Sequence, residues 1–96
     1  MSSDTGRQIR EYRIPSATEF TMEFHSPANV VHVAATKNGP RMWVEEDLAR
    51  ERVPANFSTG DAIPAGYAYV GTCIMDGQIE GGIGYIPLHL HREQPI

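Results

Sequence analysis

Apolar and polar residues alternate most clearly between Thr18 and His25. Phe20, Met22 and Phe24 fall on one side of an extended chain, and the polar residues between them fall on the other. A period of two is typical of an antiparallel strand with one buried face. This segment is therefore predicted to be a β-strand.

Other segments are rich in the β-branched and aromatic residues that suit a pleated sheet. Two turn dipeptides, Asn38-Gly39 and Asp76-Gly77, each separate a pair of such segments, and both tolerate the positive φ of tight hairpin turns. Two hairpins are predicted, with their turns at these dipeptides. The further strands are expected at 8–14, 29–36, 41–45, 50–57, 68–75 and 84–91, and residues 45–50 form at most one short helical turn.

The predicted fold is all-β, with about seven mostly antiparallel short strands in a small sandwich or a partly open barrel. The connections are too short for parallel crossovers. Pro54 and Pro87 cannot donate to a ladder, which places them at sheet edges or bends. The expected core consists of Ile14, Phe20, Met22, Phe24, Val31, Val33, Met42, Val44, Val53, Phe57, Val70, Ile74, Ile86, Leu88 and Leu90.

The length of 96 residues fits one domain. We expect a single β-domain over residues 8–92, a flexible N-terminus over residues 1–7 and a C-terminal tail over residues 93–96. Twelve acidic residues against eight basic ones give a net charge of −4, which opposes binding to nucleic acid. The acidic run 45–47 is expected to be a solvated turn.

Neither export nor membrane insertion is indicated by the sequence. No apolar run approaches the ~20 residues that span a bilayer, and the first residues lack the apolar stretch of a signal peptide. Cys73 is the only cysteine, so an intramolecular disulfide is excluded, which fits a reducing cytoplasm.

Several short motifs, in this order along the chain, resemble a family of small uncharacterised proteins encoded by actinobacteriophages and their relatives. The matching residues lie between about Ile9 and His91, and the most specific element is a T-G-x-x-I-P-x-G loop at Thr59–Gly66 followed by a Y-V-G-T strand at Tyr69–Thr72. The resemblance implies phage origin and a location in the host cytoplasm. It implies no catalytic residue and no cofactor.

His89 and His91 are the sharpest chemical candidates, since residues two apart on a strand share a face and could both bind a metal. The interpretation that the sequence favours is a pair of solvent-facing histidines that alternate with buried leucines, so no metal site is predicted. Cys73 lies in mid-strand, where a cysteine is usually a small packed hydrophobe rather than a nucleophile. We expect no enzymatic activity and no cofactor.

Large aromatic side chains are expected on the outside of the predicted sheets. Trp43, Tyr67, Tyr69 and Tyr85 alternate away from the predicted core. Such residues are enriched in protein interfaces, so these four are predicted to contact a protein. The alternative is that a bulge shifts the register and places some of them in a second core layer.

The leading functional hypothesis is a non-enzymatic phage-type accessory protein that binds a host or phage protein, with host takeover or growth inhibition as the result. Open strand edges would also permit a homodimer. The alternatives are a structural or decoration component of the virion and a metal-binding protein that uses His89 and His91.

Overall fold

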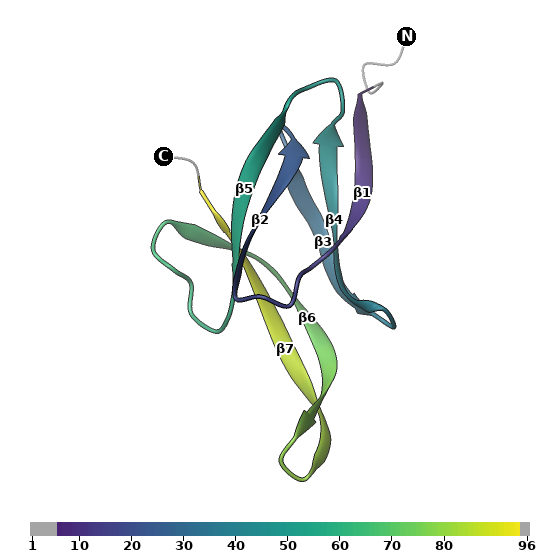
Figure 1. The fold of residues 1–96 in the computed structure, drawn as a ribbon, viewed down its shortest axis with the longest axis vertical. Coiled ribbons are helices and arrows are strands. Elements are labelled where there is room, and N and C mark those ends of the chain that lie inside the picture. Colours follow the sequence, from purple (N-terminus) through teal and green to yellow (C-terminus); the bar gives the residue numbers. More distant parts are fainter. Residues whose placement is uncertain (1–5, 95–96) are drawn as a thin grey trace.

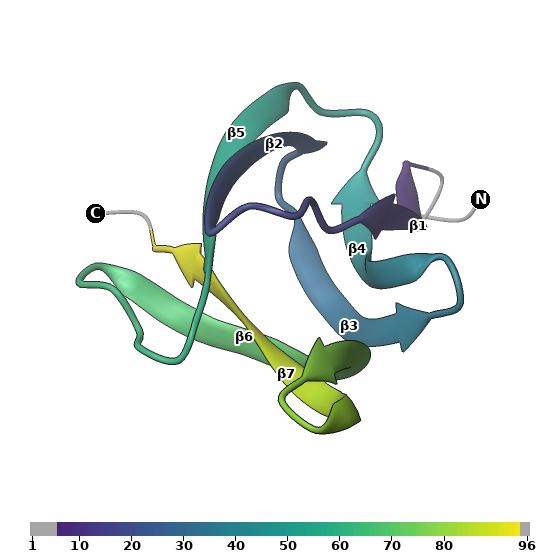
Figure 2. The same cartoon turned by 60° about the horizontal axis from the view of Figure 1, so that its bottom comes forward.

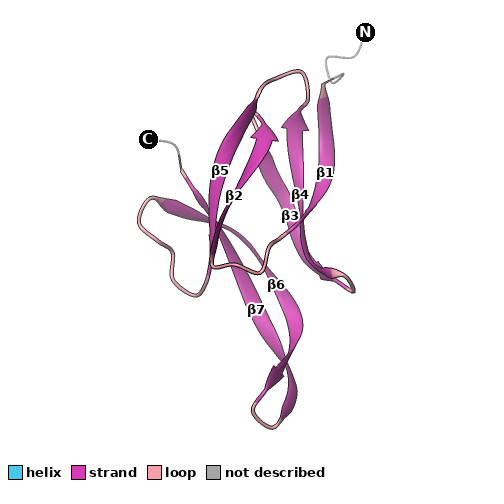
Figure 3. Cartoon of the chain, viewed as in Figure 1, coloured by secondary structure: helices cyan, strands magenta, loops and turns pink. Residues whose placement is uncertain are grey.

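The computed structural model describes residues 6–94 and confirms the predicted all-β class (Figure 1, Figure 3). Residues 47–50 form a hydrogen-bonded turn, in which the amide of Arg50 donates to the carbonyl of Asp47 at 3.0 Å. The described range contains no helix with the length and apolar character needed to cross a membrane. The strands are β1 (Arg7–Arg13), β2 (Glu19–His25), β3 (Asn29–Thr36), β4 (Gly39–Asp47), β5 (Arg52–Thr59), β6 (Tyr67–Ile79) and β7 (Gly82–Glu93).

All paired strands run antiparallel, and they form two sheets. Sheet A has the order β1-β4-β3, and sheet B has the order β2-β5-β7-β6. Figure 2 shows sheet B turning from β2 and β5 towards β6, which contacts β3 of sheet A. The architecture is a small sandwich rather than a closed barrel.

The core lies between the sheets, where the inward side chains of both meet. Phe24 and Phe57 of sheet B pack edge to face at 5.9 Å between ring centres, and Tyr12 of sheet A packs against Phe24 at 5.1 Å. Burying each large apolar side chain stabilises the fold by about 2 kcal/mol. Of the predicted core, Ile14, Phe24, Met42, Val44, Phe57 and Leu90 are fully buried, and Phe20, Met22, Val33, Val70 and Leu88 pack partly buried against them.

Two core predictions are wrong because β-bulges reverse the alternation of side chains. Val31 is the extra residue of a bulge in β3, so it is exposed and Val30 takes the inward position. A second bulge, at Val70 in β6, moves Ile74 to the outer face. A bulge places two residues opposite one, and every residue beyond it changes face.

Two more core predictions are wrong because the residues lie where the sandwich ends. Val53 faces inward opposite Phe24, but it precedes the point at which β5 joins β7, and it is exposed. Ile86 also belongs to the inward side of β7, yet it lies beyond the last residue paired with β5. Neither residue has a facing sheet to cover it.

Both predicted hairpins exist, but their turns differ from the predicted positions. In the first, Thr36 pairs with Gly39, so Lys37 and Asn38 form the turn. The prediction of a turn at Asp76-Gly77 is wrong, because both residues continue the ladder of β6 with β7. Residues 80 and 81 connect these strands instead, and Gly81 and Gly82 supply the positive φ angles of 92° and 140°.

A buried carboxylate joins the two sheets. Glu46 of β4 is almost completely buried, where the sequence predicts a solvated turn. It accepts a hydrogen bond from the Tyr12 hydroxyl of β1 and another, at 2.8 Å, from the backbone amide of His25 in β2. The prediction fails because Glu46 continues the inward alternation of Met42 and Val44 to the end of β4.

Pro54 and Pro87, the two prolines predicted at sheet edges or bends, occupy strand positions with one unpaired side. Pro54 pairs with Glu23 of β2, and on its other side β5 has not yet joined β7. Pro87 pairs with Ile74 of β6, and β5 does not reach its other side. The predicted flexible N-terminus lies outside the described residues except for residues 6 and 7, and so do residues 95 and 96 of the predicted tail.

Candidate protein interface

Three of the four predicted interface residues lie on one face of the β6–β7 hairpin. Tyr67, Tyr69 and Tyr85 share this face with His89 and His91, because residues directly opposite in an antiparallel pair project to the same side. We call this surface the outer face of the hairpin. It points away from the core that Leu88 and Leu90 enter on the opposite side.

Trp43 lies elsewhere, on the outer side of sheet A. It stands opposite His32 in the β3–β4 ladder, and the two rings lie 5.1 Å apart. It is half-buried, with Arg41 and Glu45 on the same side of its strand. The structure therefore does not bring the four predicted aromatic residues onto one surface.

A chain of polar contacts orders the outer face beside the β5–β6 loop. The Tyr69 and Thr72 hydroxyls lie 2.5 Å apart, and the Thr72 hydroxyl lies 2.8 Å from His89 Nδ1. On the far side of the ring, His89 Nε2 lies 3.9 Å from a carboxylate oxygen of Asp61, whose side chain is almost fully exposed. These contacts hold the His89 ring in one orientation, while the exposed pair with Asp61 contributes little.

The T-G-x-x-I-P-x-G loop is fastened to β7 at both ends. The Gly60 amide donates to the His89 carbonyl at 3.2 Å, and the Gln94 amide donates to the Gly66 carbonyl at 2.8 Å. The Tyr67 amide donates to Pro64, and Gly66 has a φ of 84°, which is typical of the third residue of a type II turn. Gly66, the last residue of the motif, is thus required by the turn that precedes β6.

His91 is buried in the middle of sheet B, so the prediction of a solvent-facing histidine is wrong for this residue. Its exposed fraction is 2%, it stands between Ser58 of β5 and Tyr69 of β6, and its Nδ1 has no hydrogen-bond partner. His89 shares the face but has Nδ1 engaged by Thr72. Within residues 6–94, no three His, Cys, Asp or Glu side chains are placed to hold a metal ion together.

The hairpin extends past the rest of the sandwich, as Figure 1 shows at the bottom of the view. Pairing with β5 ends at Leu90, so residues 74–87 pair only with each other. We call residues 74–87 the projecting half, and residues 67–73 with 88–93 the body half. The outer face of the projecting half carries Ile74, Ile83 and Tyr85, which are 54%, 80% and 78% exposed.

The sequence pattern predicts Ile74 in the core, where the structure exposes it, and assigns no role to Ile83. The signal for Ile83 is its spacing of two from Tyr85 in the same strand. No comparable signal marks Ile74, because its face depends on the bulge at Val70. On the other side of the ribbon, Ile86 lies across Gly77, where an added Cβ would meet it at 2.2 Å.

The charged residues in the sequence of the projecting half and of the loop before β6 are all acidic. No lysine or arginine occurs between residues 53 and 91, whereas Asp61, Asp76 and Glu80 fall within that stretch. The strands of the projecting half therefore carry apolar side chains with only acidic groups among them, and the nearby cation is Lys37 of the β3–β4 turn, which shares a cavity with Ile74 and Asp76.

Cys73 lies at the boundary of the two halves, opposite Leu88 on the inward side. It is buried, and burial raises the pKa of its thiol. The neutral thiol is therefore the favoured form, which agrees with a packed hydrophobe and not with an activated nucleophile.

The comparison with family models identifies residues 5–81 as a domain of unknown function, DUF7352. This match covers most of the chain, so the protein belongs to the DUF7352 family. The matched range includes the first six strands and ends at the β6–β7 turn, before β7. No curated protein and no solved structure matches the chain significantly.

Proposed function

We propose that this member of the DUF7352 family is a non-enzymatic accessory protein of phage origin that binds a host protein through the projecting half of its β6–β7 hairpin. The binding takes place in the host cytoplasm, and growth inhibition is its expected consequence. The resemblance of the T-G-x-x-I-P-x-G loop and the Y-V-G-T strand to actinobacteriophage proteins supports the phage origin.

The observation that carries the proposal is the exposure of Ile74, Ile83 and Tyr85 on one face of a ribbon that extends past the sandwich. Contiguous exposed apolar side chains mark interaction sites in soluble proteins. Removing them from water on binding yields about 25 cal/mol per Å² of apolar surface. An isolated two-stranded hairpin is also only marginally stable, so a partner would stabilise it.

The charges of the hairpin define the chemistry of the partner. Asp76 and Glu80 carry the only charges between Gly66 and Arg92. Complementary potentials guide association and exclude wrong partners. The partner surface is therefore an apolar groove with lysine or arginine at its rim.

A non-enzymatic role agrees with the state of the reactive side chains. The Cys73 thiol is buried with a raised pKa, and His91 has no acidic or nucleophilic partner on its Nδ1. His89 is held by Thr72 and lies near only an exposed carboxylate. The Thr72 hydroxyl beside His89 is the arrangement nearest to a nucleophile with its base, and the exposed carboxylate of Asp61, 3.9 Å from the ring, does little to activate it.

The test is affinity capture from an actinobacterial host lysate with three forms of the protein as bait. Ile83→Asp removes the most exposed apolar residue of the hairpin. Ile9→Asp is the matched control, since Ile9 is also an isoleucine on a strand, is 60% exposed and lies on sheet A. A host protein held by the wild type and by Ile9→Asp, but lost with Ile83→Asp, supports the proposal.

Retention of the same host protein by Ile83→Asp would contradict the proposal that the projecting half binds it. Equal loss with Ile83→Asp and Ile9→Asp would contradict the proposal as well. Sedimentation of the wild type and Ile83→Asp separates the homodimer from the host complex. A dimer that Ile83→Asp dissociates would assign the projecting half to self-association instead. Detection of the protein in purified phage particles would favour a virion component.

A further inference from the structure

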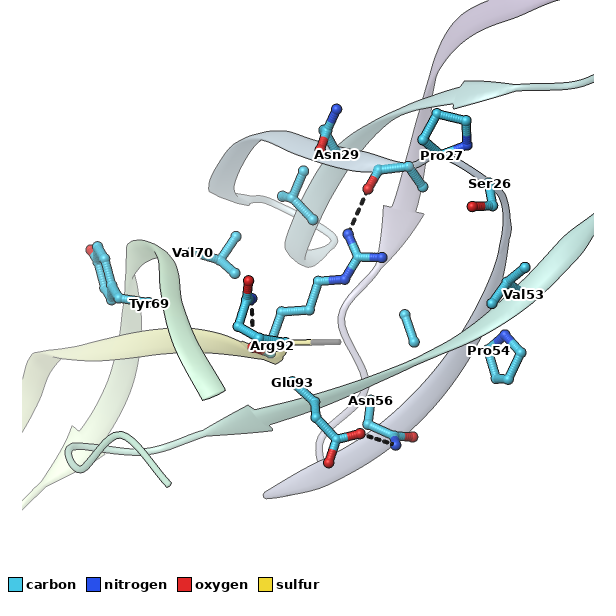
Figure 4. A pocket seen from close by; sticks show the side chains of 14 residues that line it. Ser26, Pro27, Asn29, Val53, Pro54, Asn56, Tyr69, Val70, Arg92 and Glu93 are labelled. Atoms are coloured by element: carbon cyan, nitrogen blue, oxygen red, sulfur yellow. Dashed lines mark hydrogen bonds between the residues drawn. The ribbon is translucent and has the colours of Figure 1, made fainter. Parts of the chain in front are cut away.

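A cavity of about 610 Å³ opens at the end of the sandwich, away from the projecting half (Figure 4). It exists because β5 pairs with β7 only from Phe57 to Thr59, so the two strands separate before Phe57. The connection between β2 and β3 closes the other side. This volume is within the range of small-molecule sites in proteins.

Arg92 of β7 lies in the middle of this cavity. Its Nη1 donates to the Ala28 carbonyl at 2.6 Å, and its guanidinium carbon lies 5.9 Å from the centre of the Phe57 ring. Figure 4 shows the second terminal nitrogen directed into the cavity. A guanidinium has five N–H donors, so most of the binding capacity of this side chain is unused by the described residues.

No described carboxylate neutralises Arg92. Among residues 6–94, none lies within 4.0 Å of its guanidinium. The adjacent Glu93 is bound elsewhere, because Asn56 Nδ2 donates to its carboxylate at 2.8 Å (Figure 4). Arg92 is half-buried, and this burial lowers its pKa. A charge withdrawn from water without a counter-ion is costly, and an anion would offset that cost.

The rest of the wall is mixed, with apolar residues next to the polar side chains of Ser26, Asn29, Asn56 and Tyr69. Two prolines and three valines line the cavity around the guanidinium, on the β2–β3 connection and on strands β3, β5 and β6. They are Pro27, Val30, Val53, Pro54 and Val70. A ligand that contacts both Arg92 and these five residues combines an anionic group with an apolar portion, and Glu93 at the rim disfavours a second negative charge.

We propose that this cavity binds an amphipathic monocarboxylate, with its carboxylate on the free nitrogens of Arg92 and its apolar body against the prolines and valines. A planar carboxylate matches the fork of a guanidinium better than other anions of one charge. The carboxylate could belong to a free organic acid or to the C-terminus of an apolar peptide. The site is separate from the projecting half, so the two proposals fail independently.

The test is an NMR titration of the full chain with octanoate, with octanamide as the neutral ligand of the same shape. A second pair, acetyl-leucyl-leucine and its amide, represents a peptide C-terminus. We expect backbone shifts at Val30, Ala55 and Val70, and at least about tenfold tighter binding of an acid than of its amide. The pair that shows this ratio identifies the source of the carboxylate.

Two variants locate the binding. Arg92→Gln removes the cation, and the tenfold ratio should fall to about one. Because this change also removes a hydrogen bond to Ala28, Val53→Trp provides an independent check. Val53 lies at the exposed end of β5, so tryptophan there should fill the cavity and abolish binding without disturbing the core.

Three results would overturn the proposal. The first is no shift at about 10 mM of either acid, where even a weak ligand of this kind would bind. The second is equal binding of acid and amide. The third is a set of shifts that map to the projecting half and persist in Val53→Trp.

Discussion

The two halves of the β6–β7 hairpin have the same secondary structure but different surroundings. In the body half, β7 pairs with β5 as well as with β6, and Leu90 is completely buried. In the projecting half, the strands pair only with each other, and three isoleucines and a tyrosine are exposed. Pairing between two strands therefore does not by itself bury their side chains. Burial requires a second sheet that packs against the hairpin.

The apolar residues of the two halves also differ in role: those of the body half stabilise the fold, and those of the projecting half are available for binding. Apolar residues in the body half are required for folding, because removing them leaves cavities between the sheets. Apolar residues in the projecting half have no such role. This separation can be tested by matched changes in the two halves.

The largest effect is expected for a pair of truncations in β7. Leu90 and Ile86 lie on the same side of one strand, 0% and 43% exposed. Leu90→Ala should lower the free energy of unfolding by about 3 kcal/mol, because it opens a cavity in a closed core. Ile86→Ala should lower it by about 1 kcal/mol or less. Urea denaturation of both variants measures the difference, and equal losses would show that the projecting half is folded into the core.

A second comparison uses two acidic residues. Glu46→Ala removes the carboxylate that accepts from Tyr12 and from the His25 amide, and it leaves both donors without a partner. A loss of about 3 kcal/mol is expected. The control, Asp76→Ala, changes an exposed acid of the projecting half and should alter stability by less than about 0.5 kcal/mol. Thermal unfolding distinguishes the two, and a mild effect of Glu46→Ala would disprove the role of this bridge.

The smallest effect concerns Cys73, at the boundary of the halves. Burial raises the pKa of this thiol above its ordinary value of 9.0, so the folded state favours the protonated form. The stability that this preference contributes is complete below pH 9 and is lost as the pH rises through the raised pKa. Cys73→Ser should therefore show a smaller fall of melting temperature than the wild type between pH 8.5 and about 10.5.

Reaction of the folded protein with a thiol reagent provides a second readout of the same boundary. At pH 8, Cys73 should react at least about tenfold more slowly in the folded protein than in urea. A folded rate close to the unfolded one would mean that the body half of the hairpin opens readily.

Much of the fold could be predicted from the sequence, because local rules govern it. The alternation of Phe20, Met22 and Phe24 predicted β2 and its inward face, and the Asn38-Gly39 dipeptide predicted the first hairpin to within one residue. Glu46 also followed a visible rule, since it continues the alternation of β4. Its negative charge led to the prediction of a solvated turn.

The candidate sites were harder to predict because they depend on features that leave no local mark. Ile74 faces outward because of the bulge at Val70, and the residues around Val70 give no indication of a bulge. The end of β5–β7 pairing decides that Ile86 is uncovered and that Arg92 lies in a cavity. Both follow from the number of residues over which β5 and β7 stay paired, and these strands lie far apart in the sequence.

The order of sheet B has a consequence for synthesis on the ribosome. Because β7 lies between β5 and β6, these two strands cannot join the same sheet until β7 has left the exit tunnel. Until then the nascent chain lacks Leu90 in its core and leaves the edges of β5 and β6 open. A translation product that stops at the β6–β7 turn should therefore aggregate or be degraded, so the cell obtains this sandwich only after residue 93 has been made.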